Sequence, residues 1–301
     1  MAIPLFPEFA PLAMEFRAQM NEELSLAPDG VSEFTFGGLY LFRNRYRYKV
    51  SALEDKTLIV SGIQPPHGSV EKEMSFFSTP CRFPGPDVLI ELFKTHDYWK
   101  NIPESILENE RARLEQLGVL IEEDMDNSDY LYLRTDLALL QGKKYHKKRN
   151  LVAQFLKLYN HEEKPLVAEL VGDAIKVLEK WRLEKGEIGD YVACREALEH
   201  FDELGMSGLL FYVDGKPVGW CLGEPVARGK FFAVHFEKGL DGYKGIYQFI
   251  NRSFAASLPE SFTHINREQD IGDLGIRQAK MTYRPSGFVR KYTGKMTVTS
   301  R

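Results

Sequence analysis

Hydrophobic and polar positions along the chain form two series of elements in a similar order. In the first series, helical spacing of apolar residues over 12–24 precedes an aromatic segment over 34–48, which we expect to begin as a helix and end as a strand. The pattern then predicts a hairpin with strands over 48–53 and 57–63, a strand over 74–78, a helix from Asp87 to about Lys94, a helix over 103–117 and a strand over 119–122.

The second half of the chain repeats this order. The expected elements are a strand over 208–213, a two-residue turn at Asp214 and Gly215, strands over 217–222 and 230–236, a glycine-containing loop over 239–245 and a helix from Ile246 to about Ala256. The distance from hairpin turn to helix start is roughly 30 residues in each half. This spacing indicates a repeated α/β unit.

An acidic, polar stretch over 122–129 separates the two series and lacks residues that could form a core. With 301 residues, the chain has room for two domains of about 150 each. We therefore expect an N-terminal domain over 1–125 and a C-terminal domain over 126–301 that carries the active site. The C-terminal domain begins with a strand over 130–133, a long helix within 136–159, and helices over 165–183 and 191–204.

Composition excludes several classes of protein. The content of 44% hydrophobic and 27% charged residues is typical of a folded chain, and the net charge of −4 gives no overall attraction to nucleic acid or anionic lipid. Cys81, Cys194 and Cys221 are odd in number and lack metal-ligand spacing, which favours a reduced protein without a metal site. Since the start is not a signal peptide and no stretch approaches the roughly 20 apolar residues of a membrane span, we expect a cytoplasmic protein without integral membrane contact.

A basic cluster lies in the long helix within 136–159. Six residues within seven positions carry it: Lys143, Lys144, His146, Lys147, Lys148 and Arg149. Such a cluster could bind the phosphates of coenzyme A or the backbone of a tRNA, and a solvated helix face is the alternative. We expect His146 to point inward.

A second candidate follows the apolar segment over 262–265. If strand geometry continues, Asn266, Glu268 and Asp270 face one side. Two carboxylates on one face repel, which can raise one pKa towards neutrality and create the general base that acyl transfer needs. Glu268 is the favoured base; the pair could equally bind an ammonium group, or the segment could be a plain loop with Asp270 or Asp273 capping the next helix.

Several motifs resemble those of one known family. They are LLQGKKYHKKRN (139–150), VHFEK (234–238), GIYQFIN (245–251), INREQDIG (265–272), GIRQAK (275–280) and YRP (283–285). With these motifs the chain resembles a bacterial family of soluble proteins similar to the C-terminal catalytic domain of phosphatidylglycerol lysyltransferase. The resemblance implies two fused acetyltransferase-like domains with a cleft between them, related to Fem-type aminoacyltransferases, which use aminoacyl-tRNA.

The resemblance also suggests binding roles in the second half. Gly242, Lys244 and Gly245 stand where acetyltransferases cradle the coenzyme A pyrophosphate, although Tyr247 replaces the last small residue of the usual pattern and the first cationic or amide residue is missing. A plain glycine turn is the alternative. Four further residues could hold a substrate in the cleft, against the alternatives of a surface pair and a structural histidine: Arg277, Lys280, Tyr283 and His235.

Together these observations predict an α/β (α+β) protein of two tandem acetyltransferase-like (GNAT-like) domains, with mixed central sheets flanked by helices. The expected activity is transfer of an aminoacyl or acyl group, from aminoacyl-tRNA or acyl-coenzyme A, to an amine or hydroxyl of a small-molecule or lipid-like acceptor. A coenzyme A-dependent N-acetyltransferase and a non-catalytic ligand-binding module of the same fold are the alternatives. We expect no metal.

Overall fold

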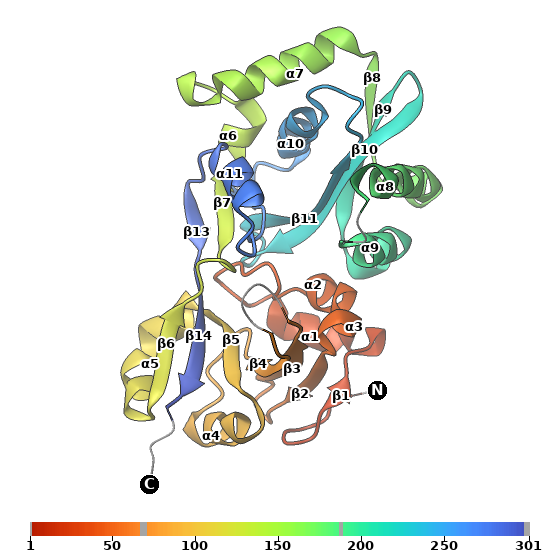
Figure 1. The fold of residues 1–301 in the computed structure, drawn as a ribbon. Helices are drawn as coiled ribbons and strands as arrows, with labels where there is room; N and C mark the ends of the chain where they lie inside the picture. The colour runs from red at the N-terminus through yellow and green to blue at the C-terminus, as the bar shows by residue number, and fades with distance from the viewer. Residues whose placement is uncertain (1, 67–70, 187–188, 298–301) are drawn as a thin grey trace.

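The computed structural model describes residues 2–66, 71–186 and 189–297. It contains two seven-stranded mixed sheets flanked by helices, one in each half of the molecule (Figure 1). The predicted fold class is therefore confirmed. Within the described residues, no helix combines the length and apolar character needed to span a bilayer.

The first sheet collects strands from the first 123 residues and one strand from the C-terminal end. In spatial order its strands are β1 (Ala10–Pro11), β2 (Lys49–Ala52), β3 (Leu58–Gln64), β4 (Met74–Ser78), β5 (Tyr98–Pro103), β14 (Lys291–Met296) and β6 (Val119–Glu123). Its helices are α1 (Arg17–Leu24), α2 (Phe36–Leu41), α3 (Arg43–Tyr46), α4 (Pro86–Thr95) and α5 (Glu104–Gln116).

The second sheet has the same arrangement. In spatial order its strands are β8 (His161–Pro165), β9 (Ser207–Val213), β10 (Lys216–Val226), β11 (Phe231–Gly239), β12 (His264–Asn266), β7 (Asp129–Leu133) and β13 (Gly287–Val289). Its helices are α6 (Arg134–Leu139), α7 (His146–Leu158), α8 (Val171–Lys185), α9 (Tyr191–Leu204), α10 (Ile246–Ser257) and α11 (Leu274–Met281).

The two sheets exchange one strand each. In each sheet, three consecutive antiparallel strands lead to a helix and a parallel strand, as β4 leads through α4 to β5 and β11 leads through α10 to β12. In chain order the strands form two series, β1–β7 and β8–β14, and the next position in each sheet is filled by the last strand of the other series. β14 lies between β5 and β6, and β7 lies between β12 and β13. We call this the reciprocal strand exchange; in Figure 1 it is the pair of crossings that joins the upper and lower sheets.

The exchange changes the expected domain division. The segment over 122–129 does separate β6 in the first sheet from β7 in the second, but Lys291–Met296 belongs to the first sheet. A boundary that assigns all of 126–301 to one domain therefore differs from sheet membership at the C-terminal end. Local patterning shows that 291–296 can form a strand, but it does not show which sheet the strand joins.

The long helix expected within 136–159 is broken. α6 ends at Leu139, and Leu140 and Gly142 have φ angles of 50° and 84° before α7 begins at His146. Tyr145 is fully buried, whereas His146 is exposed. The expectation that His146 points inward is wrong because the break turns the adjacent Tyr145 towards the core.

An apolar core continues between the two halves. Phe36 and Leu39 of α2 belong to the same buried cluster as Leu198 of α9 and Trp220 of β10. At its edge, Arg43 of α3 makes two hydrogen bonds of 3.0 and 2.7 Å to the carboxylate of Glu196. The halves therefore form one packed unit, and cavities between them have fixed walls.

Candidate functional site

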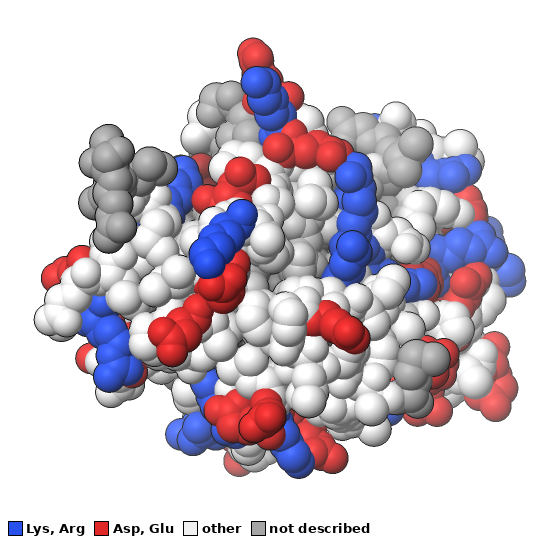
Figure 2. Space-filling model, turned by 90° about the horizontal axis from the view of Figure 1, so that it is seen from below, with Lys and Arg blue, Asp and Glu red and all other residues white. Residues whose placement is uncertain are grey.

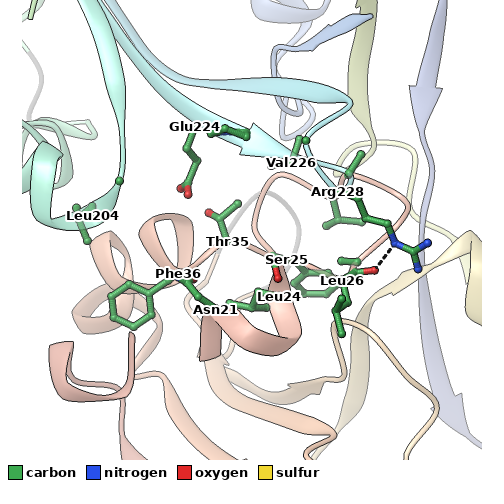
Figure 3. A pocket seen from close by; sticks show the side chains of 18 of the residues that line it. Asn21, Leu24, Ser25, Leu26, Thr35, Phe36, Leu204, Glu224, Val226 and Arg228 are labelled. Atoms are coloured by element: carbon green, nitrogen blue, oxygen red, sulfur yellow. Dashed lines mark hydrogen bonds between the residues drawn. The ribbon is translucent and has the colours of Figure 1, made fainter. Parts of the chain in front are cut away.

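A cavity of about 520 Å³ lies between the two halves. Its floor is formed by α1 and the following segment to Phe36, and its other walls by the end of α9 and by β10 with the turn after it (Figure 3). Most of the wall is apolar: Leu24, Leu26, Ala27, Val31, Phe34, Phe36, Leu204 and Val226. This size lies within the range of about 300–1,000 Å³ that is usual for ligand sites.

Charged side chains at this cavity are few. Glu224 projects from β10 towards Thr35, and Arg228 closes one side by donating from Nε to the Leu26 carbonyl oxygen at 2.8 Å (Figure 3). Arg17 also lines the cavity, and its buried Nε has no hydrogen-bond partner among the described residues. The cavity therefore combines an apolar wall with one carboxylate and two guanidinium groups.

Behind Glu224 lies a chain of three hydrogen-bonded side chains. His235 Nε2 is 3.1 Å from Glu224 Oε1, and His235 Nδ1 is 2.7 Å from Glu268 Oε1. Exposure of the side chains rises from 4% for His235 to 11% for Glu224 and 27% for Glu268. The histidine is thus enclosed between two carboxylates, of which Glu224 lines the cavity.

The charge of His235 follows from this enclosure. Burial by itself lowers the pKa of His235, but the hydrogen bonds and negative charges of Glu224 and Glu268 outweigh burial and raise it to about 10. At neutral pH the ring is an imidazolium that donates one hydrogen bond to each carboxylate. This arrangement fixes the orientation of Glu224 at the cavity wall.

Sheet register brings the three residues together. β10 and β11 are antiparallel, with Glu224 opposite Ala233, so that Glu224 and His235 reach the same site. Glu268 follows β12 with a φ of 56°, and its amide nitrogen donates to Asn266 Oδ1 at 2.7 Å. The expected strand geometry over 266–270 is therefore wrong, because β12 ends at Asn266.

Asn266 belongs to a buried network at the reciprocal strand exchange. Its Nδ2 donates to Asp129 Oδ2 and to the Gly30 carbonyl oxygen, each at 2.9 Å. Asp129 Oδ1 is 2.6 Å from Lys291 Nζ, which also pairs with Glu33. Asp129 and Lys291 are the first residues of the exchanged strands β7 and β14. We call Asn266, Asp129, Lys291 and Glu33 the crossing network. Asn266 thus stabilises the crossing and is not placed at the cavity.

Asp270 and Arg277 pair with each other. Arg277 donates two hydrogen bonds of 2.8 Å to Asp270 and also pairs with Asp126 at 2.6 Å. Burial raises the pKa of Asp270, but the hydrogen bonds from Arg277, Tyr130 and the Gly272 amide outweigh burial and lower it to about 2. Asp270 is therefore an ionised structural partner, and it is not a carboxylate of raised pKa. Asp273 caps α11, as one alternative predicted.

Lys280 and Tyr283 support the same loop. Lys280 Nζ donates to the backbone oxygens of Arg267 at 2.7 Å and Glu268 at 3.0 Å, and also to that of Gln269. Tyr283 is buried against Lys148, whose Nζ lies 4.0 Å from the ring centroid. Both residues are thus committed to contacts within the chain, and their assignment to substrate stays a prediction.

The basic cluster is divided between internal and exposed members. Lys144 pairs with Asp136 at 2.8 Å, and Arg149 donates to the Leu140 carbonyl and to that of Gly142 at 2.7 Å. Lys143, His146 and Lys147 are exposed, and within the described ranges they have no ion pair. These three residues remain available to a polyanion.

The loop before α10 is packed against α7. At Gly245, which has a φ of 85°, a Cβ atom would clash with the Leu151 carbonyl oxygen. The Lys244 amide donates to the Tyr159 hydroxyl at 3.1 Å, whereas Gly242 has open space around it. Packing of α7 therefore accounts for the glycine at 245, and the role of this loop in cofactor binding stays a prediction.

Sequence reasoning missed Glu224, Glu33, Asp129 and Lys291. The available signal for Glu224 was a single carboxylate within the otherwise apolar segment over 217–226. In the part of the chain that the structure describes, no group of three or more His, Cys, Asp or Glu side chains could hold a metal ion.

Known proteins resemble this chain in sequence and in fold. The model of the family "Phosphatidylglycerol lysyltransferase, C-terminal" matches residues 25–294. A conserved protein of unknown function from Bacteroides thetaiotaomicron is 27% identical, with 96% of this chain and 99% of that chain covered and a TM-score of 0.82. An uncharacterised protein of Mycoplasmoides gallisepticum is 24% identical over 180 residues, which is 56% of each chain, so the match spans about half of that relative.

Two further structures share the fold at low identity. L-PGS from Bacillus licheniformis is 13% identical, with a TM-score of 0.62 and coverage of 96% of this chain and 93% of that chain. FemX is 8% identical, with a TM-score of 0.60 and coverage of 96% and 97%. At these identities the likeness concerns the fold.

Proposed function

Since the chain belongs to the phosphatidylglycerol lysyltransferase C-terminal family, we propose that it transfers an aminoacyl or acyl group to an amine or hydroxyl acceptor in the cavity between its halves. The observation that carries the proposal is the carboxylate of Glu224, which lines this cavity and is held from behind by His235. In this scheme Glu224 is the general base, and His235 and Glu268 are positioning residues.

The proposed reaction needs one proton acceptor. The nitrogen or oxygen of the acceptor attacks the carbonyl carbon of the donor ester, and its proton passes to Glu224. The ester carbon–oxygen bond then breaks, and the departing oxygen takes this proton from Glu224, which regenerates the carboxylate. A positioned base of this kind contributes about 10²–10⁴-fold to the rate.

We propose aminoacyl-tRNA as the donor. The start of α10, where a coenzyme A pyrophosphate would have to bind, is packed against Leu151 and bonded to Tyr159. The exposed Lys143, His146 and Lys147 offer positive charge for a tRNA backbone instead. On the face of the first half in Figure 2, Lys and Arg alternate with Asp and Glu, so that face has no broad basic field. We place the reaction in the cytoplasm, where charged tRNA is present.

The test is single-turnover loss of label from tRNA charged with radioactive amino acids, with amines and water as acceptors. We expect Glu224→Gln to lower the rate at least a hundredfold and Glu260→Gln, an exposed carboxylate, to leave it unchanged. Full activity in Glu224→Gln would contradict the proposed base. Loss of activity in both variants would point to a general effect on the fold.

A thermal-shift titration with coenzyme A and acetyl-coenzyme A tests the other donor. A saturable rise of the unfolding midpoint, together with acetyl transfer, would replace aminoacyl-tRNA by acyl-coenzyme A in the proposal. Binding of either donor without turnover would indicate the non-catalytic binding module.

A further inference from the structure

A second cavity, of about 220 Å³, lies where the first sheet meets the crossover segment between β6 and β7. Its lining includes Arg45, Gln64 and Lys100 from the first half and Asp124 and Asp126 from the crossover segment. None of these residues belongs to the proposed transfer site. With a volume below the usual range of about 300–1,000 Å³, the cavity suits a small ligand.

Lys100 is the unusual member of this lining. It is 8% exposed, and its Nζ donates to Gln64 Oε1 at 2.5 Å. The Nζ lies 5.1 and 4.9 Å from the ring centroids of Tyr46 and Phe76. Within the described ranges, no carboxylate oxygen lies within 4.0 Å of it. An ammonium group has three hydrogens to donate, and a buried charge without a counter-ion is costly.

Burial has a measurable consequence for Lys100. Burial lowers the pKa of Lys100 to about 8, although the charges of Glu33 and Asp124 oppose the shift, while Lys291 and Arg45 add to it. At neutral pH the group is therefore still mostly charged. An anion bound in the cavity would supply the missing counter-charge.

Arg45 offers a second cation at the same cavity. It is exposed, its Cζ lies 5.8 Å from the Tyr46 ring centroid, and it makes no ion pair with any residue that the structure describes. Each carboxylate of the lining has a partner within the chain, and the partner of Asp124, Asn127, lines the same cavity. Asp126 pairs with Arg277 at 2.6 Å, and Asp124 accepts a hydrogen bond of 2.8 Å from the Asn127 side chain.

We propose that this cavity binds the phosphate group of a small ligand between Lys100 and Arg45. A phosphate monoester carries about −1.5 to −2 charges near pH 7. This charge matches two cations better than the single negative charge of a carboxylate ligand would. The guanidinium of Arg45 can donate two parallel hydrogen bonds to phosphate oxygens, and Lys100 adds a point charge. This proposal does not depend on the proposed transferase activity.

Inorganic phosphate is the probe, titrated into the full chain at constant ionic strength. Isothermal titration calorimetry and the thermal unfolding midpoint are both recorded. We expect saturable binding and a rising midpoint for the wild type, and at least tenfold weaker binding for Lys100→Met and for Arg45→Gln. Lys49→Met, which removes an exposed lysine of the same sheet, should bind as the wild type does.

Three results would overturn the proposal. The first is that phosphate gives no saturable heat, and the second is that Lys100→Met and Arg45→Gln bind phosphate as the wild type does. The third is that the midpoint rises equally in the wild type and all three variants, which would indicate general stabilisation by an excluded salt. Acetate at the same ionic strength distinguishes the ligand chemistry: equal or tighter binding of acetate would replace phosphate by a carboxylate. Because Arg45 is exposed, its variant keeps the test valid even if Lys100→Met perturbs folding.

Discussion

Removal of the Lys291 ammonium should strongly destabilise the protein. Lys291 is fully buried, and its Nζ is paired with the fully buried Asp129 at 2.6 Å and with Glu33. Burial lowers the pKa of Lys291, but the two carboxylates outweigh burial and raise it, so the lysine is charged at neutral pH. The substitution Lys291→Met keeps most of the side-chain length and removes the charge.

The expected loss can be estimated from this geometry. Breaking a buried ion pair by removing one partner costs about 3–5 kcal/mol because the remaining charge stays buried without compensation. Asp129 keeps hydrogen bonds from the Ser32 amide and from Asn266, each at 2.9 Å, which favours the lower end of that range. With a urea m-value of about 3 kcal/mol/M, the unfolding midpoint should fall by about 1 M or more.

The measurement is urea denaturation followed by fluorescence of the buried Trp99 and Trp220, which lie in β5 and β10, one in each sheet. The matched control is Lys295→Met, because Lys295 lies on the same strand β14 and is exposed. A loss below about 0.5 kcal/mol in Lys291→Met, or an equal loss in both variants, would refute the reasoning. Combining Lys291→Met with Asp129→Asn should cost less than the sum of the single losses, because the two residues interact directly.

Two further predictions concern neighbouring parts of the site. A Cβ at Gly37 would lie 2.5 Å from Glu224 Oε1, so Gly37→Ala should displace this carboxylate and slow transfer at least tenfold in the single-turnover assay, whereas Gly172→Ala, with open space around it, should not. Burial raises the pKa of Asp270, but the hydrogen bonds from Arg277 outweigh burial and lower it to about 2. The ionised Asp270 therefore contributes stability that is present above about pH 4 and is lost as the pH falls from about 4 to 2. Asp270→Asn should therefore reduce stability at neutral pH and flatten its decline below pH 4 in urea titrations, and an unchanged pH profile would contradict the pairing.

Much of the fold is predictable because its signals are local. The hairpin around the turn at 54–56 and the helix starting at Ile246 follow from alternation, turn residues and helical spacing within about 15 residues. The break at Leu140 was not predictable in the same way. Leu140 adopts a left-handed backbone that leucine rarely favours, and packing of Tyr145 in the core selects it.

The site was predictable only in part because it depends on contacts between distant segments. Glu268 and His235 were both candidates, but 33 residues separate them, and the sequence does not show that they meet. Glu224, which places this pair at a cavity, looked like one polar residue in a buried strand. The carboxylates expected on one face of 266–270 separate because the chain leaves strand geometry after Asn266.

The reciprocal strand exchange has a consequence for protein synthesis. In the first sheet, β14 lies between β5 and β6 and pairs with both. It is synthesised about 170 residues after β6. At about 5–20 residues per second, β5 and β6 wait roughly 10–35 s with unpaired edges until β14 is synthesised. The N-terminal half therefore cannot complete its fold as the chain emerges, and a nascent chain stalled before residue 291 should expose edges that molecular chaperones recognise.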